Sequence, residues 1–261
     1  MHIMEKVLSL AEPYLKGKNI TVTDGVIGAQ YLGVTLSTGR SHCVLALWED
    51  VPIGDDLVPP EGFVGRDAWE IAQWALYGSN DIRRGLGIAV LNAASPFYDD
   101  PRYTDFQEDF LCDPDPDTVL GMIGYMPPKV KVYSKQVKEI ICFDRGIQRR
   151  GYMGNVSIHP MEQESELLPT CDVVIVTGTT ATNGTIDNVL SWCDNAKEIE
   201  LNGWSLPFYP EAYRGTGITC LSAARFQDDC AELFKRLSLG QGMDQVSRFS
   251  KHIFCVSSHI L

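Results

Sequence analysis

Residues 171–185 read CDVVIVTGTTATNGT, an apolar run followed by glycines and small hydroxyl residues. The apolar run is typical of a strand that is buried on both faces of a parallel sheet. A helical pattern follows at 186–193, so this stretch predicts a strand, a loop and a helix. Similar apolar runs, separated by helical stretches, lie at 119–124, 139–144, 198–203, 217–222 and 252–256. This alternation predicts an α/β fold with a doubly wound, Rossmann-like, mostly parallel sheet.

The first half of the chain has a different pattern. Three segments of strand length, separated by short turns, predict an antiparallel meander, and three amphipathic patterns predict helices. The strands are expected at 20–27, 30–37 and 41–48, and the helices at 1–17, 66–77 and 81–94. The Asp- and Pro-rich stretch 98–117 has no sustained period and predicts a linker. We therefore expect an α+β domain with its linker over 1–112 and a Rossmann-like domain over 113–261.

The composition is that of an ordinary globular protein, with 44% hydrophobic and 21% charged residues among 261. The net charge of −12 opposes binding to nucleic acid or anionic lipid, because both attract clustered Lys and Arg. Charged residues interrupt the apolar pattern of 1–17, so this segment does not resemble a signal peptide, and no later stretch is apolar over a bilayer's thickness. We expect a cytoplasmic protein that binds neither nucleic acid nor membranes, and a homodimer fits a chain of this size.

The soft metal donors are scattered. The eight cysteines contain no C-x-x-C pair, and most lie in apolar runs, which predicts buried, reduced thiols rather than disulfides or a zinc site. His42 and Cys43 are adjacent on a predicted strand, where neighbouring side chains point to opposite faces. Both could bind one metal only if the strand were distorted, so His42 alone is kept as a weak metal candidate.

Ligands of open parallel sheets bind beyond the carboxyl ends of the strands, which directs attention to the loops that follow them. The loop at 124–128, GYMPP, stands where a dinucleotide-binding protein has G-x-G-x-x-G, but only Gly121 and Gly124 are present. Its two prolines remove backbone N–H donors, which disfavours ordinary NAD binding. Asp144 ends the next strand and could act as a general base or bind ribose hydroxyls, or it could cap a loop or pair with Arg145 or Arg149.

The loop within 171–185 is the most informative of these segments. Its glycines and hydroxyls let a backbone approach a polar or anionic ligand, and the following helix N-terminus attracts negative charge. The alternative is that residues such as Asn183 simply cap that helix. After the next strand, Trp204 could stack on a planar ligand or pack in the core, and Ser205 could bind the ligand or start a helix. The hydrolase, P-loop and zinc-protease motifs G-x-S-x-G, G-x-x-x-x-G-K-[ST] and H-E-x-x-H are absent from the sequence.

CDVVIVTGTTATNGT resembles the strand, loop and helix signature of the "putative heavy-metal chelation" family, and four other segments strengthen the likeness. They are GMIGYMPP at 121–128, NGWSLPFYP at 202–210, SHCVLAL at 41–47 and GIAVLNAA at 87–94. The resemblance implies a domain similar to the enolase N-terminal domain joined to a Rossmann-like domain, with a site between them. The lining residues that it implies are Gly124, Tyr125, Met126, Pro127, Thr179, Thr180, Asn183, Thr185 and Asn92, with His42 as a weaker addition.

Three functions fit these residues. The first is a protein that binds a small anionic or metal-complexing molecule between the domains. It would serve heavy-metal chelation or chelator metabolism, either by binding alone or as an enzyme that acts on that molecule. The second is a non-catalytic metallochaperone or ligand sensor, and the third is a nucleotide-dependent enzyme that uses the Rossmann half. Thr, Asn and Gly are poor ligands for a soft metal, so we interpret "chelation" as handling a metal complex or an organic chelator. The sequence leaves the cofactor open, with a heavy-metal ion or metal complex as the candidate.

Overall fold

A small antiparallel sheet and its helices make up the first half of the molecule. The computed structural model describes residues 1–52, 54, 56–104, 115–146 and 151–256. Helix α1 (Ile3–Leu15) precedes strands β1 (Val22–Ile27), β2 (Tyr31–Leu36) and β3 (Ser41–Leu45), which pair in the order β1-β2-β3 with both pairs antiparallel. The predicted meander is therefore confirmed, with strands that are shorter than expected at their ends.

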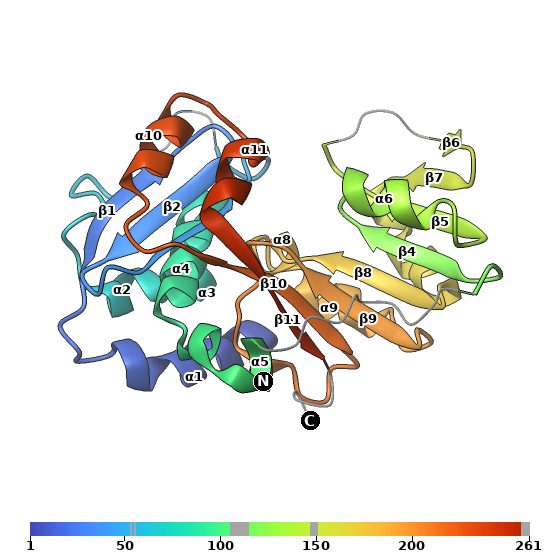
Figure 1. Cartoon of the computed structure of the whole chain (residues 1–261), viewed down its shortest axis with the longest axis horizontal. Coiled ribbons are helices and arrows are strands. Elements are labelled where there is room, and N and C mark those ends of the chain that lie inside the picture. The colour runs from blue at the N-terminus through green and yellow to red at the C-terminus, as the bar shows by residue number, and fades with distance from the viewer. Residues whose placement is uncertain (53, 55, 105–114, 147–150, 257–261) are drawn as a thin grey trace.

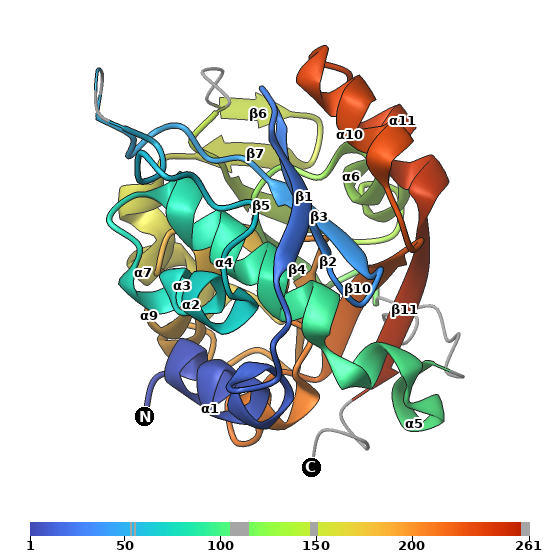
Figure 2. The same ribbon diagram turned by 90° about the vertical axis from the view of Figure 1, so that its left-hand side faces the viewer.

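Helix α4 (Asp81–Ala94) is the long helix of this half and crosses the small sheet (Figure 2). The side chain of Asn80 caps its first turn by accepting a hydrogen bond from the Arg83 N–H at 2.8 Å. The helix expected at 66–77 is instead two short helices, α2 (Ala68–Ala72) and α3 (Trp74–Tyr77). Gln73 between them keeps helical backbone angles, so the break is a tightened turn rather than a change of direction.

The second half is built on an eight-stranded sheet in the order β11-β10-β9-β8-β4-β5-β7-β6 (Figure 1). The strands are β4 (Val119–Ile123), β5 (Glu139–Phe143), β6 (Gly151–Met153), β7 (Val156–His159), β8 (Val173–Thr177), β9 (Glu198–Asn202), β10 (Cys220–Phe226) and β11 (Ser250–Val256). The six inner strands are parallel, and β6 and β11 are antiparallel edge strands. The predicted mostly parallel α/β sheet is confirmed.

Helices cover both faces of this sheet. Val174 and Ile175 are neighbours on β8 and point to opposite faces, and they belong to two separate apolar clusters. Helix α6 (Pro127–Tyr133) contributes Val130 to the cluster of Ile175, whereas α9 (Ile186–Ser191) contributes Ile186 to the cluster of Val174. The remaining helical segments are η1 (Pro96–Asp99), α5 (Pro101–Thr104), η2 (Met161–Gln163), α7 (Glu164–Leu167), η3 (Leu168–Thr170), α8 (Thr179–Thr182), η4 (Pro210–Tyr213), α10 (Ala231–Ser238), α11 (Met243–Val246) and η5 (Ser247–Phe249).

Two strand predictions need correction. The sequence pattern gave no strand at 151–159, but β7 pairs with β5 inside the sheet and Ser157 on it is fully buried. Its four residues are too few to show a period, and a polar residue stands at the buried position. Strand β10 runs to Phe226, whereas the prediction ended it at 222. The prediction stopped too early because Arg225 interrupts the apolar pattern of the strand.

The two halves share one hydrophobic core. A single cluster contains Val34 of the small sheet, Leu91 of α4 and Val176 of the large sheet. Helix α10 comes from the second half but lies against the small sheet (Figure 1), where a Cβ added to Gly33 would lie 2.5 Å from a ring carbon of Phe234. Of the predicted linker 98–117, residues 98–104 and 115–117 are described, and the predicted boundary at 112/113 lies outside the described residues. No helix in the described part of the chain is long and apolar enough to cross a membrane.

Gly87 gives a test of this packing, because replacing glycine by alanine inside a helix normally stabilises it by about 1 kcal/mol. A Cβ on Gly87 would lie 2.2 Å from the Ala75 backbone nitrogen, so α3 and α4 would have to separate. We expect Gly87→Ala to lower the free energy of unfolding by about 2 kcal/mol, measured by urea denaturation. An increase in stability would show that α3 does not pack on α4 as described.

Candidate functional site

The carboxyl ends of β4 and β8 lie side by side at the point where the sheet changes direction. From β4 the chain builds β5 on one side, and β8 later adds on the other side, which is the arrangement that leaves a ligand-binding crevice. Gly124 follows β4 with φ +82, a backbone conformation that suits glycine. A Cβ at Gly124 would lie 3.1 Å from the Thr177 Cγ2 atom, so the two loops are in contact.

Asp144 stands at the same edge, directly after β5. Its Oδ2 atom accepts a hydrogen bond from the Tyr125 N–H at 2.7 Å, which fixes the loop after β4 against the end of β5. The next residue, Arg145, places its Nη1 atom 3.8 Å from Oδ2 of Asp50, a residue of the first half. This edge of the sheet therefore faces the first half, and Arg145 brings a half-exposed positive charge to it.

The hydroxyl-rich segment does not form one open loop. Thr179 begins the short helix α8, and its Oγ1 atom lies 3.1 Å from the Oγ1 atom of Thr177. Thr180 is buried and donates its hydroxyl to the Thr177 carbonyl at 2.8 Å. Thr177 and Thr179 are the half-exposed hydroxyls beside Gly124. We refer to Gly124, Tyr125, Asp144, Thr177 and Thr179 as the sheet-edge site.

Asn183 and Thr185 form a local turn in front of α9. The Asn183 Oδ1 atom accepts hydrogen bonds from the Thr185 N–H at 3.2 Å and from the Thr185 hydroxyl at 2.8 Å. This is the turn-forming role that short polar side chains commonly take. On the other side of α8, the Thr182 carbonyl accepts a hydrogen bond from Nε of Arg84, which ties the segment to α4. Asn183 thus forms a turn before α9 and makes no side-chain cap bond to the helix itself, and a ligand role for Asn183 and Thr185 stays a prediction.

Met126 and Pro127 lie where the loop after β4 turns into α6. Pro127 opens the helix at a position that needs no backbone N–H donor, and Met126 is half-buried against the apolar cluster under α6. The prolines that disfavoured a dinucleotide loop are therefore the start of a helix. Of the four predicted residues in this loop, Gly124 and Tyr125 make the contacts to the neighbouring strand ends.

Asn92 joins the two halves rather than standing at the sheet-edge site. Its side-chain amide donates to the Leu206 carbonyl at 2.9 Å, and its Oδ1 atom accepts from the Phe208 N–H at 2.8 Å. The Ser205 hydroxyl accepts a hydrogen bond from the Leu45 N–H at 3.0 Å. These bonds fasten residues 204–208, which we call the junction segment, to α4 and β3. Asn92 and Ser205 are both buried, so their polar atoms serve this contact.

His42 completes the junction. Its Nε2 atom lies 2.8 Å from the Trp204 carbonyl oxygen, and burial lowers the pKa of His42 to about 4, so the ring is neutral near pH 7. The Trp204 ring packs against Tyr31, with ring centroids 5.6 Å apart, which agrees with a packing role. Cys43 points to the opposite face, into the apolar cluster that contains Phe234.

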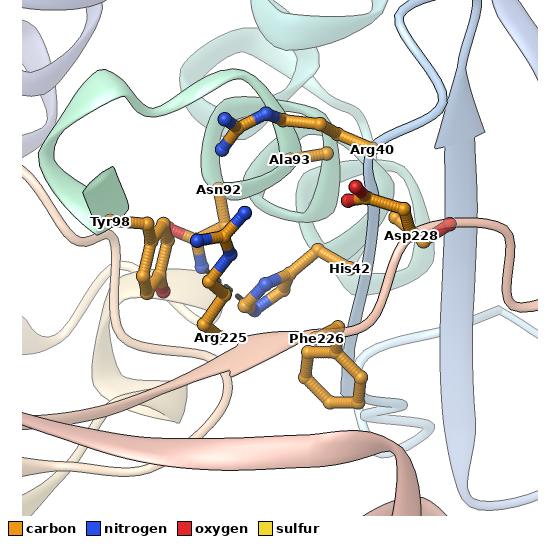
Figure 3. A pocket seen from close by; sticks show the side chains of 9 residues that line it. Arg40, His42, Asn92, Ala93, Tyr98, Arg225, Phe226 and Asp228 are labelled. Atoms are coloured by element: carbon orange, nitrogen blue, oxygen red, sulfur yellow. Dashed lines mark hydrogen bonds between the residues drawn. The ribbon is translucent and has the colours of Figure 1, made fainter.

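A small pocket lies on the other side of His42, where the start of β3 meets the end of β10 (Figure 3). It is lined by Arg40, Ser41, His42, Asn92, Ala93, Tyr98, Arg225, Phe226 and Asp228. Sequence reasoning named His42 and Asn92 but missed the charged residues. The predicted end of β10 was four residues too early, so Arg225 and Asp228 were not recognised as strand-end residues.

The described residues do not fit a preformed soft-metal cage. No three His, Cys, Asp or Glu side chains within the described ranges come together as ligands. All seven described cysteines are buried. Burial raises the thiol pKa of Cys230 to about 11 and those of Cys171 and Cys193 to about 12. Since metals bind the thiolate, metal binding would require these thiols to ionise in buried surroundings that disfavour the charged form. Cys112 lies outside the described residues.

Glu164 is a buried acid that the sequence pattern did not single out. It opens α7 beyond the end of β7, and its Oε1 atom is buried without a hydrogen-bond partner among the residues that the structure describes. Burial raises the pKa of Glu164 to about 7, although the charge of Arg145 acts in the opposite direction. A carboxyl group that titrates near neutral pH thus lies within the electrostatic reach of the sheet-edge arginine.

Family comparisons cover most of the chain. A family model described as "Putative heavy-metal chelation" matches residues 109–255, and a second model with the same description matches residues 9–95. An uncharacterized protein of Methanocaldococcus jannaschii is 31% identical over 152 residues, a match that covers 56% of this chain and 56% of that protein.

Two crystal structures share the fold. A protein of unknown function from Pyrococcus horikoshii superposes with a TM-score of 0.79 at 23% identity, covering 98% of this chain and 100% of that one. A protein of unknown function from Desulfitobacterium hafniense gives a TM-score of 0.71 at 15% identity, covering 97% and 99%. At these identities the structures establish the likeness of fold alone.

The junction can be tested by replacing Asn92 with alanine. The change leaves the Leu206 carbonyl and the Phe208 N–H buried without partners, which costs about 1–3 kcal/mol for each group. We expect Asn92→Ala to lower the free energy of unfolding by about 3 kcal/mol in urea denaturation. Asn188→Ala, at an exposed position in α9, is the control and should change it by less than about 0.5 kcal/mol. Equal effects of the two substitutions would contradict the junction.

Glu164 gives a pH test. Its pKa is raised in the folded state, so its contribution to stability is present at low pH and is lost as the pH rises through about 7. Glu164→Gln removes this ionisation. We expect the free energy of unfolding of the variant, relative to that of the parent, to increase by about 2 kcal/mol between pH 5 and pH 8. Urea denaturation at each pH measures this difference. Glu162→Gln, at an exposed neighbour, should show no such trend, and a flat difference for both would refute the burial effect.

Proposed function

Because the chain belongs to the family described as "putative heavy-metal chelation", we propose that it binds a small anionic or metal-complexing molecule at the sheet-edge site, between its two halves. The observation that carries this proposal is the meeting of three strand ends at the switch point of the sheet. Gly124, Asp144 and Thr177 each follow or end a different parallel strand, and contacts between their loops hold them together.

The side chains at this site complement an anionic molecule that also carries hydroxyl groups. Arg145 offers a half-exposed guanidinium whose ion pair with Asp50 is long, at 3.8 Å, so a carboxylate or phosphate of the ligand could replace Asp50 at little cost. Thr179 offers a hydroxyl, and the Asp144 carboxylate, oriented by the Tyr125 N–H, can accept a hydrogen bond from a ligand hydroxyl. The same position would suit Asp144 as a general base.

A metal enters this proposal as cargo within a complex. The buried thiols and the neutral, bonded imidazole of His42 do not assemble into a cage among the described residues, whereas organic chelators carry carboxylates and hydroxyls that match Arg145 and Thr179. The family description and the donor chemistry are therefore compatible when the protein recognises the chelator and not the bare ion.

The test is native mass spectrometry with elemental analysis, first on freshly purified protein and then with citrate and Ni²⁺-citrate added at millimolar concentration. We expect an organic species or a metal complex bound at one per chain. Thr179→Val and Asp144→Asn should each reduce the bound fraction at least fivefold, since each removes one polar contact. Thr38→Val and Asp194→Asn, at exposed positions away from the site, are the matched controls.

Three results would contradict the proposal. A metal retained without an organic partner, and unaffected by either site variant, would point to direct coordination. Equal losses for the site variants and their controls would place the ligand elsewhere. If the freshly purified protein carries no ligand and binds neither citrate nor Ni²⁺-citrate, the sheet-edge site is not a chelator site. Conversion of a bound species during incubation would add a catalytic step to the binding function.

A further inference from the structure

The pocket beside His42 has a buried polar floor and a charged rim. His42 is only 1% exposed, and Asn92 and Tyr98 beside it are also buried. Arg40 and Arg225 are about one-third exposed, and Asp228 is exposed. Figure 3 shows the guanidinium of Arg225 and the carboxylate of Asp228 on either side of the His42 ring. This pocket is separate from the sheet-edge site, and the inference drawn from it does not rest on the proposed function.

The floor of the pocket offers a hydrogen-bond acceptor. The His42 Nε2 atom lies 2.8 Å from the Trp204 carbonyl oxygen and 3.2 Å from the side-chain nitrogen of Asn92. Because a carbonyl oxygen can only accept, the shorter contact assigns the hydrogen of the neutral ring to Nε2 and the lone pair to Nδ1. Nδ1 makes no hydrogen bond with any residue that the structure describes, although the side chain is almost fully buried. His42 lines the pocket, so a ligand there could donate a hydrogen bond to Nδ1.

The rim gathers two positive charges on one carboxylate. Arg225 places its Nη1 atom 2.6 Å from Oδ1 of Asp99, and Arg40 pairs with the other carboxylate oxygen of the same residue. The three residues come from the start of β3, from η1 and from β10. Both arginines line the pocket and Asp99 does not, so Asp99 reaches the guanidinium groups from outside it. This arrangement holds two guanidiniums where a bound carboxylate would need them.

Asp228 supplies the opposite polarity. It lines the pocket and makes no hydrogen bond or ion pair with any described residue, so its charge is open to a hydrogen-bond donor. The pocket thus presents donors on one side, from Arg40 and Arg225, and acceptors on the other, from Asp228 and His42. A simple anion would satisfy only the arginines and would face the carboxylate of Asp228 and the lone pair of His42.

We propose that the His42 pocket binds a small α-amino or α-hydroxy carboxylate, and that Asp99 occupies the two arginines when this ligand is absent. The ligand carboxylate pairs with Arg40 and Arg225 in place of Asp99. Its amino or hydroxyl group donates to His42 Nδ1 and to Asp228. A carboxylate with a neighbouring hydrogen-bond donor is the chemistry that both ligand types share, and it matches the two arginines on one side and His42 and Asp228 on the other.

A ligand of this kind has to displace Asp99, because the pocket itself is small. Its volume is about 10 Å³, which is room for a single water-sized species. The side chain of Asp99 is 40% exposed and those of Arg40 and Arg225 are 31% and 38% exposed, so all three can move without disturbing the core. The floor is held more firmly, because His42 and Asn92 are bonded to the junction segment.

Ligand-observed NMR titration of the full chain tests this inference with four probes. Glycine and glycolate carry both groups, acetate lacks the donor, and methylammonium lacks the carboxylate. We expect glycine or glycolate to bind at least tenfold more tightly than acetate and methylammonium, and the preferred one of the pair identifies the ligand class. Acetate that binds as tightly as both would overturn the proposal, because the site would then be a general anion patch.

Three variants test the assignment of roles. Arg225→Gln and Asp228→Asn should each weaken binding of the preferred probe at least tenfold, which corresponds to 1.4 kcal/mol. Asp99→Asn should strengthen it threefold or more, because an uncharged amide competes poorly for two guanidiniums. Arg102→Gln, which removes a nearby exposed arginine that pairs with Asp100, is the control and should have no effect.

The charged positions are on the surface, so these variants are expected to fold, and urea denaturation checks this. Weaker binding by Asp99→Asn would show that Asp99 belongs to the binding site and does not compete with the ligand. The folded Asp99→Asn protein is also titrated with glycine and with glycolate, at 50 times the protein concentration and at ligand concentrations up to roughly 100 mM. If neither ligand binds, the site is refuted altogether.

Discussion

The structure depends on the buried amide of Asn92. This single side chain on α4 bonds the carbonyl of Leu206 and the N–H of Phe208, and so fixes the segment that connects β9 with the rest of the second half. Backbone groups of a connecting segment must find partners when they are buried, and Asn92 supplies one donor and one acceptor where no strand is available. His42 and Ser205 add two more bonds to the same segment. The two halves are thereby held in one orientation, with a shared core behind them.

Both candidate sites follow from this fixed orientation. The sheet-edge site needs the ends of β4, β5 and β8 to face the first half, and the contact between Arg145 and Asp50 spans the two halves there. The His42 pocket needs the start of β3 to meet the end of β10, where Arg40 and Arg225 converge on Asp99. Neither arrangement would persist if the halves moved freely. Polar groups from distant parts of the chain are thus brought together at the sheet-edge site and at the His42 pocket by the packing of the two halves.

The sequence predicts the parts of this structure that follow from local pattern. Apolar runs identify β4, β5, β8 and β9, and the position of Asp144 at a strand end follows from them. The pattern fails at β7, whose four residues carry a buried serine, and at the end of β10, where Arg225 interrupts the apolar run. The convergence of Arg40, Asp99 and Arg225 has no local signal, because three segments far apart in sequence create it. Asn92 was named as a lining residue from resemblance, but its bonding to the junction segment depends on tertiary structure.

Hydrogen exchange of the native protein is the most direct test of the claim that the junction makes the two halves one cooperative unit. The amides of Val34 in the small sheet, Val174 in the large sheet and Phe208 in the junction segment report on the three regions. If the account is correct, all three exchange with the same free energy of opening, equal to that of global unfolding. A free energy of opening for Val34 or Phe208 that is several kcal/mol below that of Val174 would contradict it, because one half would then open while the other stays folded.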